Sequence, residues 1–180
     1  MNAVCIRPAV PADADTIADF QLRMARESEG LALDPSTVRA GVGAVFDDPT
    51  KGRYWVAEAD GRIVAVLLTI PEWSDWRNAA VLWIHSLYVV PEARRRGVFR
   101  RLYSHLRNLV ERSPGLAGLR LYVAKRNYRA HKAYDAVGMT REHYHLYECL
   151  KTGSGSDLKI QNKAHAPRRG ARHHDPYFVI

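Results

Sequence analysis

The sequence is poor in cysteine and has no long uninterrupted apolar segment. Its two cysteines, Cys5 and Cys149, lie far apart, with no Cys-x-x-Cys spacing and no histidine at ligand spacing. This pattern excludes the common disulfide frameworks and zinc sites and favours two buried thiols. No apolar run approaches about 18 residues, and proline and aspartate occur too early for a secretory leader. We therefore expect a soluble, cytoplasmic protein that does not bind a membrane.

Acidic residues are outnumbered by basic ones. The chain carries 27 Lys and Arg against 19 Asp and Glu, a net charge of +8. Such an excess favours an anionic partner, which includes nucleic acid, a membrane surface or a phosphorylated small molecule. About half of the excess lies in residues 151–180, and the cluster from Arg94 to Arg101 accounts for the rest. A nucleic-acid binder that uses this cluster and the tail is one hypothesis, but the phosphates of a small ligand would also explain the cluster.

The composition divides the chain into a domain and a tail. With 180 residues, of which 47% are hydrophobic, residues 1–150 can form one globular domain with its own core. The sequence Gly-Ser-Gly-Ser at 153–156 is typical of linkers, and few apolar residues follow it before the last four. We expect 151–180 to be a flexible, disordered basic tail. Its His165, His173 and His174 lack a scaffold, so no metal is expected.

Hydrophobic periodicity and turn residues predict alternating strands and helices before the tail. Asp60-Gly61 between two strand-like runs is the strongest hairpin signal. Trp73 and Trp76 lie in a predicted polar loop, where they either cover a sheet edge or line a substrate pocket. The predicted order is strand 4–10, helix from Asp13 or Asp15 to Gly30, helix 35–46, hairpin strands 53–59 and 62–70, loop 71–78, strand 81–90, helix from Phe99 to Arg112, strand 119–124, helix 127–137 and strand 139–150.

Residues 81–111 predict an anion-binding site. A continuous apolar strand ends at Pro91, and a helix with apolar residues on one face begins at Phe99. Three arginines and Gly97 lie in the turn between them. The first N–H groups of a helix have no intrahelical partner and lie at the positive end of its dipole, so a glycine turn there can bind phosphate. A solvated basic loop is the alternative interpretation of this turn alone.

Two motifs together resemble the GNAT superfamily of N-acetyltransferases. PEARRRGVFRRL is similar to the acyl-CoA signature of that family, with Arg94, Gly97 and Phe99 at its defined positions. The later VAKRNYRAHKAYDAVGM is similar to the family's second motif through Asn127, Ala130, Tyr134 and Gly138-Met139. The resemblance covers residues 4–150. The family has a small residue where Phe99 stands, and we expect the Phe99 ring to point into the sheet while its N–H faces outward.

The resemblance implies a fold and a cofactor site. It implies an α/β (α+β) domain of GNAT fold, with a mixed, mostly antiparallel sheet and about four helices, splayed between strands 81–90 and 119–124. It implies that acetyl-CoA pairs its pantetheine arm with Leu87, Tyr88 and Val89. The family-implied diphosphate site comprises Arg94, Arg95, Arg96, Gly97, Val98, Phe99 and Arg100.

The same resemblance implies catalytic roles. Tyr134 would donate a proton to the departing thiolate, although it could also simply pack. Asn127 would cap the helix or bond the cofactor arm. The base stays open among His85, Glu72 and a water chain, and His143 and His145 could also reach the pocket. Some relatives place a Glu where this chain has Tyr122.

The predicted function is transfer of an acetyl group from acetyl-CoA to a primary amine of a small molecule or peptide. The amine would attack acetyl-CoA directly in a ternary complex, because no cysteine lies near the motifs to form a covalent acyl-enzyme intermediate. No metal is expected to take part. A non-catalytic acyl-CoA-binding or regulatory module of the same fold is the alternative, and the nucleic-acid binder is the less favoured one. A homodimer stays open.

Overall fold

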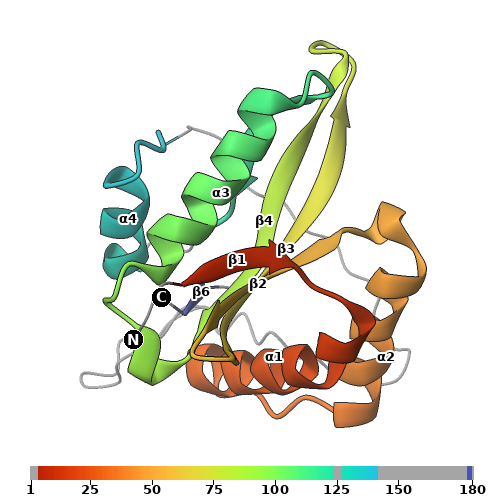
Figure 1. Cartoon of the computed structure of the whole chain (residues 1–180), viewed down its shortest axis with the longest axis vertical. Coiled ribbons are helices and arrows are strands. Elements are labelled where there is room, and N and C mark those ends of the chain that lie inside the picture. The colour runs from red at the N-terminus through yellow and green to blue at the C-terminus, as the bar shows by residue number, and fades with distance from the viewer. Residues whose placement is uncertain (1–3, 124–126, 142–177, 180) are drawn as a thin grey trace, which may run out of the picture.

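The computed structural model describes residues 4–123, 127–141 and 178–179 (Figure 1). Five strands form a sheet in the order β1-β2-β3-β4-β5. Neighbours from β1 to β4 are antiparallel, whereas β4 and β5 are parallel. The strands are β1 (Cys5–Pro8), β2 (Arg53–Ala59), β3 (Arg62–Ser74), β4 (Ala79–Val89) and β5 (Leu116–Leu121), and a two-residue β6 (Phe178–Val179) pairs with β4.

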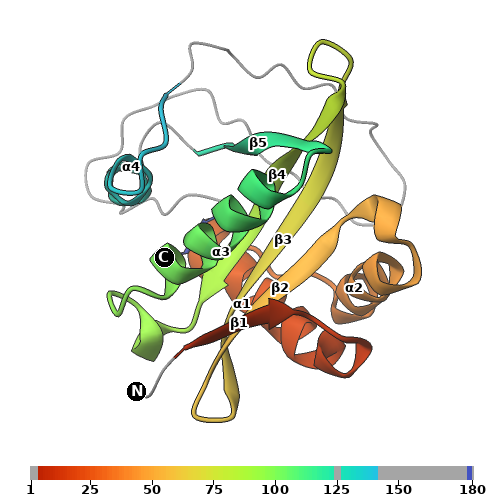
Figure 2. The same cartoon turned by 45° about the horizontal axis from the view of Figure 1, so that its top comes forward.

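Helices cover both faces of this sheet. The helices α1 (Ala14–Glu29) and α2 (Pro35–Asp47) lie on one face, and α3 (Val98–Arg112) and α4 (Tyr128–Asp135) lie on the other (Figures 1 and 2). Short 3-10 segments are η1 (Pro11–Asp13), η2 (Pro49–Lys51) and η3 (Pro91–Ala93). The predicted α/β fold class, with a mixed sheet and four helices, is confirmed. No helix of the described residues is long and apolar enough to span a membrane.

Local sequence explains where the elements begin and turn. Asp34 accepts a hydrogen bond from the Thr37 N–H at 2.8 Å, and Pro35 occupies the first position of α2. Asp60 and Gly61 have φ values of 51° and 71°, the two left-handed residues that a type I′ hairpin turn requires. The predicted hairpin between β2 and β3 is therefore confirmed.

Three expectations from the sequence are corrected. Residues 71–78 are not all loop, because β3 continues through Pro71 to Ser74 and β4 begins at Ala79. The ladder between β2 and β3 ends at Thr69, so beyond it β3 has a free edge that can accommodate a residue without an N–H. β5 begins at Leu116, earlier than predicted. Cys5 is exposed rather than buried.

The end of the predicted fold lies mostly outside the described residues. The structure describes 139–141 without strand, and the rest of the predicted strand, 142–150, lies outside the described residues, as does Cys149. Of the expected tail, only β6 is described, and its backbone pairs parallel to β4, with Leu87 opposite Phe178 and Tyr88 opposite Val179.

The centre of the sheet contains a β-bulge at His85. On β3, Leu68 lies opposite Ser86 and the next residue, Thr69, lies opposite Ile84, so His85 is an extra residue in β4. The parallel pairing of β4 with β5 ends at Ile84 opposite Leu121. A bulge bends its strand and increases its twist, and Figure 2 shows β5 leaving the line of β4. The predicted splay between these strands therefore begins at the bulge.

An ion-pair network joins β1, β2 and the start of α1. The Arg7 guanidinium donates to both carboxylate oxygens of Asp13 at 2.7 and 3.1 Å and to Glu58 at 3.1 Å. The Val10 N–H also donates to Asp13, at 2.8 Å. Asp13 is only 8% exposed. The hydrogen bond from Arg7, together with that from Val10, lowers the pKa of the Asp13 carboxyl below its ordinary value.

Replacing Asp13 with Asn should make the protein less stable at pH 7 by about 2 kcal/mol, because Arg7 loses one of its two charged acceptors, the less exposed one. A carboxyl group whose pKa is lowered in the folded state stabilises the fold above its unfolded pKa of about 4, and that contribution is lost as the pH falls through the folded value. Urea unfolding should therefore show the difference between wild type and Asp13→Asn shrinking below pH 4.

The matched control is Asp15→Asn. Asp15 is on the same turn but 97% exposed, with Arg39 4.0 Å away, so its replacement should change the free energy of unfolding by less than about 0.5 kcal/mol. Equal losses for the two variants at pH 7 would contradict the assigned role of Asp13.

Candidate functional site

The turn between β4 and α3 has an unusual backbone. After η3, Arg95 has a φ of 61° and Gly97 a φ of 78°. Left-handed φ costs a non-glycine residue about 1 kcal/mol or more, and such conformations concentrate at ligand sites. The two left-handed residues allow the chain to reverse within a few residues and start α3 directly beside the end of β4.

The first turn of α3 presents backbone N–H donors that have no hydrogen-bond partner among the described residues. The hydrogen bond from the Arg101 N–H to the Gly97 carbonyl, at 3.1 Å, is the first of the helix. The N–H groups of Val98, Phe99 and Arg100 precede it, and no side chain of the described residues caps the helix at Gly97. These amides lie at the positive end of the helix dipole, so the turn has the chemistry of an anion site.

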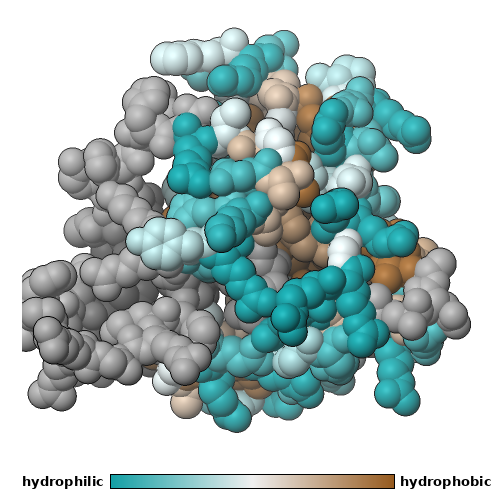
Figure 3. Space-filling model, turned by 90° about the vertical axis from the view of Figure 1, so that its left-hand side faces the viewer, coloured by the Kyte–Doolittle hydropathy of each residue, from teal (hydrophilic) through white to brown (hydrophobic). Residues whose placement is uncertain are grey.

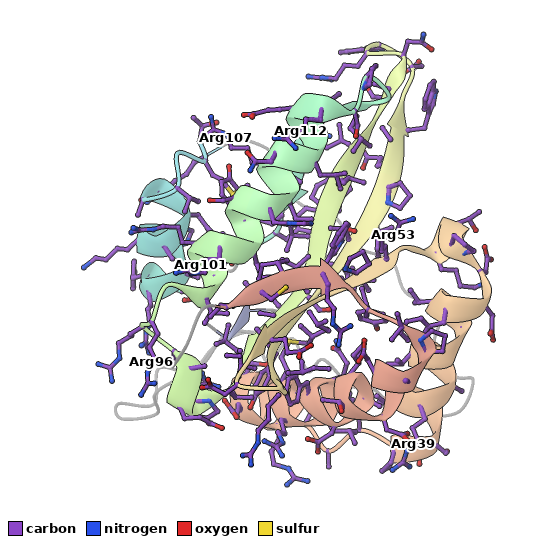
Figure 4. All side chains as sticks on the ribbon, viewed as in Figure 1. Arg39, Arg53, Arg96, Arg101, Arg107 and Arg112 are labelled. Carbon is purple, nitrogen blue, oxygen red and sulfur yellow. The ribbon has the colours of Figure 1, made fainter. Side chains whose placement is uncertain are left out.

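The arginines of this turn divide into two groups. The side chains of Arg95, Arg96 and Arg100 are exposed, and Figure 4 shows Arg96 extending from the turn and Arg101 lying at the start of α3. Figure 3 shows the side of the molecule that lies at the left of Figure 1, where the turn and α4 are found. The described part of this surface is largely hydrophilic, with a narrow apolar strip. The Arg94 side chain instead points inward, where it donates to the Val89 carbonyl at 2.8 Å and to Glu27 at 2.6 Å. Arg94 therefore supports the turn through its side chain.

The edge of β4 beyond the bulge is the predicted site of the pantetheine arm. Leu87, Tyr88 and Val89 are buried, with exposures of 0%, 1% and 2%. Beyond Ile84 this edge is no longer paired with β5, and β6 pairs with it at Leu87 and Tyr88. A strand edge can hold only one partner at a time, so another extended segment would have to displace β6 there.

Tyr134 lies on α4 against the start of α3. Its side chain is 4% exposed, and its ring meets the Phe99 ring edge-on with centroids 5.5 Å apart. Burial raises the pKa of the Tyr134 phenol well above its ordinary value of about 10, so the hydroxyl stays protonated near neutral pH. Phe99 packs toward α4 and α3, with Tyr103 6.1 Å away. The large residue at this motif position thus fills the space between the two helices.

Asn127 caps α4, because its side-chain oxygen accepts a hydrogen bond from the Ala130 N–H at 2.9 Å. This is one of its two predicted roles.

Two of the candidate bases have different surroundings. His85 is exposed at the bulge, and desolvation by neighbouring atoms lowers the pKa of its imidazole below the ordinary 6.5. Glu72 accepts hydrogen bonds from the Trp83 indole at 2.6 Å and from Arg120 at 3.1 Å, which engages both of its oxygens. His143 and His145 lie outside the described residues.

The predicted loop tryptophans are at the surface of the β3-β4 hairpin. Trp73 is 64% and Trp76 is 91% exposed, so neither belongs to the core, and both predicted roles, covering a sheet edge or lining a substrate pocket, stay predictions. The aromatic contact that sequence reasoning missed is between Trp83 and Tyr122, which stack with centroids 4.4 Å apart. The alternation of side chains along the predicted strands 81–90 and 119–124 could place Trp83 and Tyr122 on the same face of a sheet. Only the pairing of β4 with β5, which the sequence does not reveal, brings the two rings into contact.

Comparisons with known proteins agree with this geometry. The sequence profile of the acetyltransferase (GNAT) family matches residues 20–139. The crystal structure of a possible acetyltransferase from Clostridium difficile 630 is 39% identical, with a TM-score of 0.79 over 83% of this chain and 99% of that one. No curated protein matches the chain.

More distant structures share the fold. The ribosomal-protein-alanine N-acetyltransferase from Brucella melitensis biovar Abortus 2308 is 16% identical, with a TM-score of 0.67 over 83% of this chain and all of that one. The aminoglycoside N-acetyltransferase AAC(6')-Iy in complex with CoA is 13% identical, with a TM-score of 0.68 over 83% of this chain and 95% of that one. The family profile matches two thirds of the chain, and the solved structure of a possible acetyltransferase is 39% identical over 83% of it. Together with the two motifs, these matches show that the chain belongs to the GNAT acetyltransferase family.

Proposed function

We propose that this protein transfers the acetyl group of acetyl-CoA to a primary amine, by direct attack of the amine in a ternary complex. The observation that carries the proposal is the uncapped first turn of α3, which begins where β4 ends and is surrounded by the exposed Arg95, Arg96 and Arg100. Three backbone donors, the helix dipole and three cations favour a diphosphate at this position. A CoA complex of a protein with the same fold supports the choice of cofactor.

The chain offers groups for the diphosphate, the ribose phosphate and the pantetheine arm of acetyl-CoA. The amides of Val98, Phe99 and Arg100 would hold the diphosphate, and the exposed arginines would reach the remaining phosphate. The edge of β4 at Leu87 would pair with the pantetheine arm as an additional strand does, once β6 has left it. The Val89 carbonyl already accepts a hydrogen bond from the Arg94 side chain. The backbone of Leu87, rather than the Val89 carbonyl, would therefore bond to the pantetheine arm.

The transfer needs a proton acceptor for the amine and a proton donor for the thiolate. Acetyl-CoA supplies the acyl group as a thioester. His85 is the proposed acceptor, because a lowered pKa keeps its imidazole neutral near pH 7 and able to take the amine proton. Tyr134 is the proposed donor, because a phenol stays protonated near neutral pH and its ring lies against Phe99 at the start of α3. The amine would form the new C–N bond and lose a proton to His85, the C–S bond would break, and the thiolate would take the Tyr134 proton. Exchange with solvent would then return a proton to Tyr134 and remove one from His85.

Calorimetric titration tests the cofactor site. Acetyl-CoA should bind the full chain with a Kd in the micromolar range, and acetyl-pantetheine, which lacks the diphosphate and nucleotide, should bind at least about 50-fold more weakly, because the loss of several charge-assisted hydrogen bonds costs more than 2 kcal/mol. Absence of acetyl-CoA binding at high micromolar concentration would refute the proposal. A mass-spectrometric screen of amines and peptides would then identify the acceptor, and binding without any acetylated product would leave an acyl-CoA-binding module.

A further inference from the structure

A partly buried polar network connects α1 to the turn before α3. The carboxylate of Glu27, in the last turns of α1, accepts from the Tyr88 hydroxyl at 2.7 Å through one oxygen and from the Arg94 guanidinium at 2.6 Å through the other. Arg94 also donates to the Val89 carbonyl at 2.8 Å, and its guanidinium carbon lies 5.5 Å from the centre of the Tyr88 ring. One carboxylate therefore joins a helix, a strand and the turn.

The geometry fixes the Arg94 side chain in place. Its side chain is 19% exposed and that of Glu27 34% exposed, so water screens this pair less than it screens an ordinary surface pair. The Tyr88 phenol is buried and donates to Glu27, which together raise its pKa to about 12, so it remains a donor over the physiological pH range. Two hydrogen bonds and the contact with the Tyr88 ring hold the planar guanidinium of Arg94 in one orientation.

The rest of the contact between α1 and β4 is consistent with this role. The Phe20 ring packs on the Tyr88 ring with centroids 5.3 Å apart, and the Gln21 amide donates to the Ser86 hydroxyl at 3.3 Å. These contacts lie along β4 itself. Among the described side chains of α1, Glu27 is the one whose ion pair reaches beyond the strand into the turn.

We infer that Glu27 is a positioning residue for acyl-donor binding, which acts by holding Arg94 against the end of β4 and so keeps the backbone donors of residues 95–100 in their binding arrangement. The inference rests on the proposed function only for the identity of the ligand. It assigns different work to the three arginines: Arg94 organises the turn, whereas Arg95 and Arg96 remain exposed for the anion.

The sign of the effect separates this role from simple electrostatics. Glu27 is a negative charge near an anion site, so if it acted only through its charge, Glu27→Gln would strengthen acetyl-CoA binding. A positioning role predicts the opposite. Glu27→Gln keeps the size of the side chain and a neutral acceptor, and it should raise the Kd and the KM for acetyl-CoA by about tenfold while kcat changes by less than about twofold.

The matched control is Asp19→Asn. Asp19 is on the same helix and pairs with Arg23 at 2.8 Å, but both side chains are about half exposed. The control removes one carboxylate charge from α1 without touching the turn, so the Kd for acetyl-CoA should stay within twofold of wild type. Unfolding curves of both variants would exclude a general loss of structure.

Hydrogen–deuterium exchange of the ligand-free full chain gives a second measurement that does not depend on the ligand. The amides of residues 95–100 should exchange several-fold faster in Glu27→Gln than in wild type or Asp19→Asn. Unchanged exchange, or tighter acetyl-CoA binding by Glu27→Gln, would overturn the inference. If wild type itself bound no acetyl-CoA, the proposed function would fail, and the exchange rates would still decide whether Glu27 holds the turn.

Discussion

Tyr134→Phe is expected to lower kcat by about 100-fold or more while the Kd for acetyl-CoA stays within about twofold. A positioned general acid contributes about 10²–10⁴ to the rate, and phenylalanine cannot donate a proton to the thiolate. The variant keeps the ring that packs edge-on against Phe99, so the fold should be retained. Steady-state kinetics with an identified acceptor, together with calorimetry of acetyl-CoA binding, would measure the two quantities separately.

The control for this variant is Tyr103→Phe. Tyr103 is also buried, at 9% exposure, and its ring lies 6.1 Å from the same Phe99 ring. It lies on α3 and has no assigned part in proton transfer, so its loss of a hydroxyl should leave kcat near the wild-type value. If Tyr134→Phe retained wild-type turnover, Tyr134 would be a packing residue and the proton donor would have to be sought elsewhere.

Gly52→Ala should destabilise the fold by about 3 kcal/mol or more. Gly52 precedes β2 with a φ of 137° and a ψ of −168°, a region that residues with a Cβ essentially do not occupy. An added Cβ would lie 2.5 Å from the Thr69 carbonyl oxygen and 3.1 Å from a Leu68 methyl group. Since a backbone atom of β3 cannot move aside cheaply, strain and steric overlap act together. Chemical denaturation at pH 7 would measure the loss.

Gly61→Ala separates the two causes. Gly61 has a φ of 71°, also unfavourable for alanine, but an added Cβ there would meet no atom within 4 Å beyond those of its two chain neighbours. Gly61→Ala should therefore lower the free energy of unfolding only by the cost of a left-handed φ for alanine, about 1 kcal/mol. Equal losses at the two positions would mean that β3 shifts freely near Thr69, contrary to the packing described.

Local signals in the sequence predicted most of the fold. Asp60-Gly61 specifies a hairpin through its own backbone preferences, and the Pro91-to-Gly97 turn followed by an apolar stripe identified the start of α3. The length of the β3-β4 hairpin was missed because Pro71 normally interrupts a strand. It is tolerated since β2 no longer pairs with β3 beyond Thr69, a fact of sheet topology that no local pattern contains.

The candidate site was predictable where its residues are contiguous. The turn from Arg94 to Phe99 and the cap at Asn127 could be found from spacing. The direction of the Arg94 side chain could not, because its partner Glu27 is 67 residues away in sequence. Neither could the bulge at His85, which depends on how β3 and β4 align and on no residue type that marks it.

The extra residue at His85 also fixes the register of β4 against β3 and therefore the distance along β4 from the bulge to the turn. A bulge prevents β4 from sliding past β3, because any shift of register would have to move the bulge as well. From Ile84, where β5 departs, to Val89, where the strand ends before the turn, five residue steps span about 17 Å. An acyl donor anchored by its phosphates at α3 would thus bring its reactive carbon to the bulge only if its arm had the matching length, so donors with shorter or longer spacers would be discriminated against by distance alone.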